Sequence, residues 1–195
     1  MTLTRRDALL IIDVQNDFVN GALAVPHAEK IFPTIEYWVK RFELDQLEII
    51  LTRDVHPNDH CSFVEYGGEW VAHCIEGTEG AELHPVIVKL DEDCSYPFWE
   101  FEKGVESDVE EYSSFRDVDD EDEYELNNLL VEMNVERLFV CGLATEYCVL
   151  NTVIDALDRG YEVYLIADGI AGVNLDENDE YIAIGKMVQH GAKVI

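Results

Sequence analysis

The chain has 195 residues, of which 48% are hydrophobic, and no Pro/Gly/Ser-rich linker divides it, so we expect a single domain over residues 1–195. Forty-two acidic residues against 13 Lys and Arg give a formal net charge of -29, which repels phosphate backbones and anionic lipids and argues against nucleic acid and membranes as partners. No apolar stretch approaches the roughly 20 residues that span a bilayer and no signal peptide precedes the first strand-like run, so we expect a cytoplasmic protein.

The first half of the chain alternates short apolar runs with a helical pattern. Residues 8–13 form a continuous apolar run that ends in a carboxylate, which is typical of a strand covered on both faces. Apolar residues spaced three and four apart predict a helix over 28–42, and the run 47–51 predicts a second strand. Residues 55–85 are irregular and rich in Gly, His and aromatic residues, and loops of this length usually carry function. Residues 86–90 predict a third strand.

The second half follows the same alternation after an irregular stretch over 91–118. Helices are predicted over 121–133, 145–159 and 177–189, and strands over 137–141, 162–167 and 192–195. Alternating buried strands and helices predict an α/β fold with a mostly parallel sheet of about six strands, flanked by helices on both faces. Ligands in such folds bind beyond the carboxyl ends of the strands, where Asp13, Asp54 and the turn at 142–148 all fall.

Cys148 follows a buried apolar run and a break at Gly142, in the expected first turn of a helix. Unpaired amides and the positive end of the helix dipole favour a thiolate there, so a nucleophile is one interpretation. A small buried hydrophobe is the other, and it is the commoner role of a free cysteine. Lys103, in an acidic irregular stretch, could hold a thiolate and a carboxylate in place at the strand ends, although its spacing alone favours a surface charge.

The loop at 55–85 contains residues that suit a metal. Asp54 and His56 are two residues apart and would point the same way in an extended segment, and His73 lies in the same loop. One carboxylate and two imidazoles can hold Zn, Fe or Mn and leave positions for water or substrate. The alternative to a metal site is that these histidines are ordinary turn residues. His60 and Glu65 are either further ligands or a turn histidine and an exposed carboxylate.

Six motifs follow one another along nearly the whole chain: DVQNDF at 13–18, TRDVHPNDHCSF at 52–63, WVAHCIEGTEGAELHP at 70–85, KG at 103–104, YSSF at 112–115 and GLATEYCV at 142–149. In this order and spacing they resemble the motifs of the nicotinamidases, within the isochorismatase-like cysteine hydrolases.

The resemblance implies a role for each matching residue. The catalytic triad would be Asp13, Lys103 and Cys148. One divalent metal, zinc first with iron or manganese as alternatives, would be held by Asp54, His56 and His73, with Glu65 and His60 as candidates for a further ligand. Backbone amides of Ala144 and Cys148 would form the oxyanion hole, next to a cis peptide bond between residues 143 and 144. The substrate pocket would be lined by Phe18, Trp70, Tyr112 and Leu143.

An enzyme of this kind would hydrolyse nicotinamide to nicotinate and ammonia through a thioester on Cys148, a step of NAD salvage. Another small-amide cysteine hydrolase of the same superfamily is the alternative, and a non-catalytic metal- or ligand-binding domain is a third reading. The resemblance is also compatible with a homo-oligomer.

Overall fold

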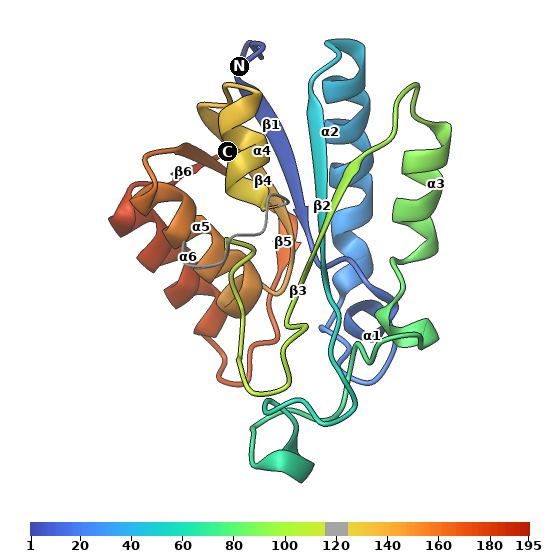
Figure 1. Cartoon of the computed structure of the whole chain (residues 1–195). Helices are drawn as coiled ribbons and strands as arrows, with labels where there is room; N and C mark the ends of the chain where they lie inside the picture. The colour runs from blue at the N-terminus through green and yellow to red at the C-terminus, as the bar shows by residue number, and fades with distance from the viewer. Residues whose placement is uncertain (116–124) are drawn as a thin grey trace.

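The computed structural model describes residues 1–115 and 125–195, and its strands form one parallel sheet in the order β3-β2-β1-β4-β5-β6 (Figure 1). The strands are β1 (Asp7–Ile12), β2 (Glu48–Asp54), β3 (Trp99–Lys103), β4 (Arg137–Leu143), β5 (Glu162–Ala171) and β6 (Lys193–Val194). This confirms the predicted α/β fold. The strand order reverses between β1 and β4, which is where such sheets place their ligands.

Helices cover both faces of the sheet (Figure 1). One face carries α1 (Asn16–Val19), α2 (Phe32–Leu44) and α3 (Pro85–Asp93), and the other carries α4 (Leu126–Glu132), α5 (Leu150–Asp158) and α6 (Asp179–His190). In β1, Leu9 and Ile11 pack into the core below α2, whereas Leu10 and Ile12 pack into the core below α5 and α6. A strand buried on both faces therefore needs the continuous apolar run that the sequence has.

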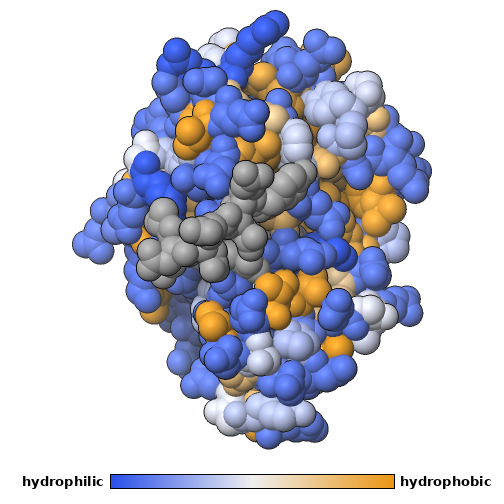
Figure 2. Space-filling view, viewed as in Figure 1, coloured by the Kyte–Doolittle hydropathy of each residue, from blue (hydrophilic) through white to orange (hydrophobic). Residues whose placement is uncertain are grey.

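The surface shown in Figure 2 is mostly hydrophilic, with apolar side chains in separate patches. Among the described residues no helix is long and apolar enough to cross a membrane.

Residues 86–90 form part of α3, so the prediction of a strand there is wrong. Pro85 occupies the first turn of the helix, where the missing N–H costs nothing, and the His84 imidazole caps that turn by accepting a hydrogen bond from the Val86 N–H at 3.3 Å. The β-branched residues suggested a strand, but in α3 only Ile87 is buried. Leu90, three residues later, packs partly against the same core, and this spacing suits a surface helix.

The third strand, β3, lies instead within the stretch 91–118 that was predicted to be irregular. It is an edge strand and pairs with β2 from Ile50–Trp99 to Asp54–Lys103. Glu100 and Glu102 alternate with the buried side chains and face solvent, where Arg53 binds both at 2.7 Å and 2.6 Å. The acidic residues that made this stretch resemble a loop therefore lie on the solvent-exposed face of an edge strand.

The remaining predicted elements are present with shifted ends. The helix predicted over 28–42 begins with a 3-10 turn (Ala28–Ile31), and the helix predicted over 145–159 begins with a π-helical turn (Thr145–Val149) before α5. Short 3-10 turns at Val64–Tyr66 and Glu79–Ala81 interrupt the irregular loop. Of the helix predicted over 121–133, residues 121–124 lie outside the described residues.

Candidate active site

The ends of three strands bring Asp13, Lys103 and Cys148 together. Asp13 follows β1, Lys103 ends β3, and Cys148 lies in the π-helical turn after β4. The Lys103 Nζ atom is 2.9 Å from Asp13 Oδ2 and 3.3 Å from Cys148 Sγ. The exposed fractions of the three residues are 0%, 1% and 5%, so the interpretation of Lys103 as a surface charge is wrong.

Asp54 joins this cluster from the end of β2. Its Oδ1 atom accepts a hydrogen bond from the Lys103 ammonium group. Ligand atoms of Asp13, Asp54 and Cys148 lie within 4.8 Å of one another, a grouping that could hold a metal. Because the Lys103 ammonium contacts all three residues, the lysine already supplies the cation that this group needs.

Burial and charge shift the proton affinities of this cluster. Burial alone would lower the pKa of Lys103, but the carboxylates of Asp13 and Asp54 outweigh it, so its pKa is raised well above the ordinary value and it stays protonated. Burial also raises the pKa of Asp13 in spite of the nearby lysine. Such a carboxylate is a better proton acceptor than a free one.

Burial of Cys148 favours the thiol over the thiolate. Burial raises the pKa of Cys148 well above the ordinary value, and the Lys103 charge does not overcome this. The expectation that the helix end favours a thiolate is therefore wrong, because the cost of placing an anion in a dry site next to two carboxylates is larger. The cysteine needs a neighbouring base to lose its proton.

A second group of buried side chains, Asp54, His56 and His73, places its ligand atoms within 4.8 Å of one another. The His56 Nδ1–H donates to the Gly104 carbonyl at 2.8 Å, and the His73 Nδ1–H donates to the Val71 carbonyl at 2.7 Å. Because a carbonyl can only accept, these bonds fix the tautomer and leave each Nε2 lone pair free. Two oriented imidazoles beside a carboxylate fit a divalent metal ion.

Burial keeps both histidines neutral, as metal ligands must be. It lowers the pKa of His56 to about 3 and also lowers the pKa of His73. Gly104 leaves room for the His56 ring, because a Cβ atom on residue 104 would lie 2.4 Å from the imidazole Cε1. The backbone of Gly104 also has a φ of 68°, which glycine adopts without strain. This explains why a glycine follows Lys103.

The structure does not bring His60 or Glu65 to the metal group. His60 is buried and stacks on the His56 ring with centroids 4.1 Å apart. Its Nε2–H donates to the Val109 carbonyl at 3.0 Å, so its Nδ1 is the acceptor for the Ser62 hydroxyl at 2.7 Å, and neither nitrogen is left for a metal. Glu65 is exposed on its 3-10 turn.

Two residues of the first motif, Gln15 and Asp17, hold the segments that carry the proposed metal ligands. The sequence analysis gave these two residues no role. The Gln15 side chain donates to the Asp54 carbonyl at 2.7 Å and accepts from the Asp54 N–H at 2.8 Å, as a neighbouring strand would. Asp17 accepts the Cys74 N–H at 2.7 Å, beside His73. The signal available in the sequence was the polar run Gln15-Asn16-Asp17 a few residues after the end of the first strand.

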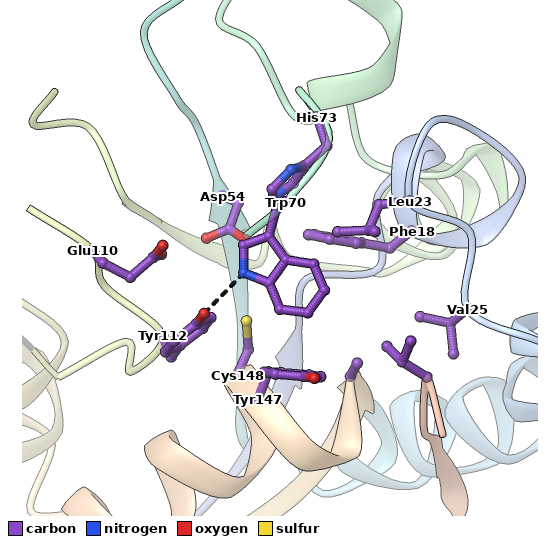
Figure 3. A pocket seen from close by; sticks show the side chains of 12 residues that line it. Phe18, Leu23, Val25, Asp54, Trp70, His73, Glu110, Tyr112, Tyr147 and Cys148 are labelled. Carbon is purple, nitrogen blue, oxygen red and sulfur yellow. Dashed lines mark hydrogen bonds between the residues drawn. The ribbon is translucent and has the colours of Figure 1, made fainter. Parts of the chain in front are cut away.

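A pocket opens above Cys148 and Asp54, with about 410 Å³ of empty space that is partly open to solvent (Figure 3). Three residues predicted to line it, Phe18, Trp70 and Tyr112, do so. The Trp70 Nε1–H donates to the Tyr112 hydroxyl at 2.9 Å, which fixes two of the aromatic walls relative to each other.

Leu143 does not line the pocket, because its side chain is fully buried in the core on the α2 side of the sheet. The peptide bond that follows it, Leu143–Ala144, is cis, as the resemblance implied. Ala144 itself lies at the pocket wall, directly before the turn that carries Cys148.

The pocket has further walls that the sequence analysis did not identify: Leu23, Val25, Glu110, Tyr147 and Val173. Tyr147 meets Trp70 edge-on with ring centroids 4.8 Å apart. The pKa of Glu110 is raised to about 7, because its carboxyl group is partly desolvated and lies near the Asp54 carboxylate. These residues come from four segments that are distant in the sequence, so no local spacing could group them.

Comparisons with known proteins identify the family of the chain. Residues 7–195 match the isochorismatase domain. A nicotinamidase of Escherichia coli is 35% identical over 95% of this chain and 92% of that protein. Pyrazinamidase of Pyrococcus horikoshii in complex with zinc superposes with a TM-score of 0.84 at 37% identity, covering 97% of this chain and 98% of that one. PnC1 from L. infantum in complex with nicotinate superposes with a TM-score of 0.86 at 30% identity, covering 100% of this chain and 95% of that one. The chain therefore belongs to the isochorismatase family.

Proposed function

We propose that this chain is a metal-dependent cysteine amidohydrolase that converts nicotinamide to nicotinate and ammonia. The observation that carries the proposal is the buried Asp13–Lys103–Cys148 cluster, which adjoins a three-ligand metal group at the floor of an aromatic pocket. Relatives named nicotinamidase and a structural neighbour that binds nicotinate support this substrate.

In the first half of the reaction, Asp13 accepts the proton of the Cys148 thiol as the sulfur attacks the carboxamide carbon. Asp13 then returns this proton to the departing nitrogen, which leaves as ammonia, and a thioester remains on Cys148. In the second half, Asp13 takes a proton from water and the resulting hydroxide attacks the thioester. The C–S bond then breaks, Asp13 returns its proton to the Cys148 sulfur, and the acid product loses its proton to solvent and leaves as nicotinate. Lys103 stays protonated and stabilises the negative charge of each stage.

The turn that carries Cys148 has a second role in this scheme. We assign the oxyanion hole to the backbone amides of Ala144 and Cys148, which belong to the pocket wall and to the π-helical turn. An oxyanion formed on the carboxamide carbon would lie within reach of amides held in place by the backbone, and these need no reorganisation during the reaction.

Asp54, His56 and His73 would hold the metal, and zinc suits a set of two imidazoles and one carboxylate. A bound metal would supply a Lewis acid that orients the pyridine ring and withdraws electron density from it. The chain's own residues would contact the ring from the pocket walls, through Phe18 and through the hydrogen-bonded pair of Trp70 and Tyr112 (Figure 3).

The proposal is tested by measuring ammonia release from nicotinamide before and after treatment with a chelator. We expect turnover that falls at least about tenfold on chelation and returns when zinc is added. Turnover that is unchanged by a chelator would contradict the metal requirement. A higher kcat/KM for an unrelated small amide in a substrate panel would instead support another cysteine hydrolase of the superfamily.

Replacing His73 with alanine is expected to weaken metal binding at least about tenfold, because one of three ligands is lost. Metal content per chain and isothermal titration with zinc measure this directly, without an activity assay. His190→Ala is the matched control, since His190 is exposed on α6 and pairs only with Asp158 among the described residues. Equal zinc affinity of the two variants would remove His73 from the ligand set.

A further inference from the structure

Glu110 lies at the rim of the pocket on the loop that follows β3. It is exposed, it lines the pocket, and its carboxyl group points toward the space between Asp54 and Tyr112 (Figure 3). Within residues 1–115 and 125–195 no hydrogen-bond donor or cation pairs with this carboxyl group. Above its pKa of about 7 the carboxyl group is charged, and because nothing in the described part of the chain pairs with it, it is available to whatever enters the pocket.

The loop on each side of Glu110 is held in place. The preceding carbonyl, of Val109, accepts the His60 Nε2–H at 3.0 Å. The following side chain, of Glu111, accepts the Gly104 N–H at 2.7 Å. His60 is itself buried and stacked on His56, so these bonds connect the loop that carries Glu110 to the buried histidines His56 and His60. The position of Glu110 is therefore set by the fold.

The charges around the pocket are unequal. Lys103 pairs with Asp13 and Asp54, and the proposed metal would add positive charge beside Asp54, whereas no cation in the described part of the chain contacts Glu110. The substrate of the proposed reaction is a neutral amide, and the product is a carboxylate. A negative group that faces the pocket discriminates between the two, because it repels the anion and leaves the neutral molecule almost unaffected.

We propose that Glu110 is a specificity-determining residue that disfavours carboxylates in the pocket, so that the neutral amide is accepted and the acid product is released. This role rests on the proposed function. It does not involve the bond-breaking steps, because the cluster that performs them is complete without Glu110.

The test compares Glu110→Gln, which keeps the shape of the side chain, with Glu106→Gln, an exposed position on the same loop that does not line the pocket. The quantities are the KM of nicotinamide and the inhibition constant of nicotinate for the zinc-loaded enzyme at about pH 8.5, where carboxyl groups are ionised. For Glu110→Gln we expect nicotinate to inhibit about tenfold more tightly, with the KM of nicotinamide within about twofold of the parent. Glu106→Gln and the charge-conserving Glu110→Asp should keep the parent ratio.

Salt separates a charge effect from a change of shape. The difference between the parent and Glu110→Gln should shrink as KCl is raised toward about 1 M, where the screening length is only ~3 Å. An unchanged nicotinate inhibition constant, or an equal change in both constants, would overturn the role of Glu110. A parent enzyme that neither hydrolyses nicotinamide nor binds nicotinate would instead overturn the proposed function itself.

Discussion

Replacing Cys148 with alanine is expected to abolish ammonia release from nicotinamide, with a fall in kcat of about 10⁴-fold or more, because no thioester can form. The fold and the metal group should survive, since Cys148 is small and its sulfur is not one of the three metal-type ligands. Lys103 would keep both of its carboxylate partners. Zinc affinity by titration and the melting temperature should therefore stay close to those of the parent while turnover is lost.

Cys94→Ala is the control for this experiment, because Cys94 is a partly buried free cysteine at the end of α3 and does not line the pocket. It should retain the parent kcat. A thiol-directed reagent gives a second measurement, in which nicotinate protects the parent from loss of activity. Turnover in Cys148→Ala within about tenfold of the parent would contradict covalent catalysis by this residue.

Replacing Lys103 with methionine is expected to lower both stability and activity. The methionine has a similar length but no charge, so the carboxylates of Asp13 and Asp54 would remain buried without a cation. Breaking a buried charge cluster in this way costs about 3–5 kcal/mol in the free energy of unfolding. The kcat should also fall by about 10²–10⁴-fold, because the charges that develop on the base and the sulfur lose their stabilising partner.

Urea denaturation followed by circular dichroism measures the first effect, and chelator-treated protein excludes stabilisation by a bound metal. Lys193→Met is the control, since Lys193 is an exposed lysine paired with Glu162 at the surface and its removal should change stability little. The contribution of Lys103 is present below the unfolded pKa of a lysine, about 10.4, and is lost only as the pH rises through its raised folded value. A Lys103→Met protein as stable as the parent at neutral pH would contradict the buried cluster.

The sequence predicted the strand ends well because the physical signal is local. A short apolar run that stops at a carboxylate is typical of a buried strand with a polar end, and Asp13 and Asp54 occupy such ends, whereas the similar run at 86–90 belongs to α3. Parallel strands place their carboxyl ends at one edge of the sheet, so the meeting of these residues with the turn at Cys148 followed from the fold class alone.

The environment of Lys103 could not be predicted locally. Its strand is an edge strand whose acidic residues resemble a loop, and its burial depends on Asp13 and Asp54, which are distant in the sequence. The same limit applies to His60, whose two hydrogen bonds are set by Ser62 and by a loop 49 residues away. Side-chain pairing across the sheet edge is a property of the assembled tertiary structure.

The distribution of the site over the chain has a consequence for protein engineering. The reacting groups and the proposed metal ligand Asp54 are fixed at the ends of neighbouring strands or in the turn that follows β4. Gly142 allows β4 to lie very close to β1, because a Cβ atom on residue 142 would be 2.1 Å from the Ile12 carbonyl oxygen. The walls of the pocket, such as Leu23 and Val173, come from the connecting loops. A mutant library limited to these loop positions would change which amide is accepted and leave the reaction chemistry intact, so the substrate range of this scaffold can diverge faster than its mechanism.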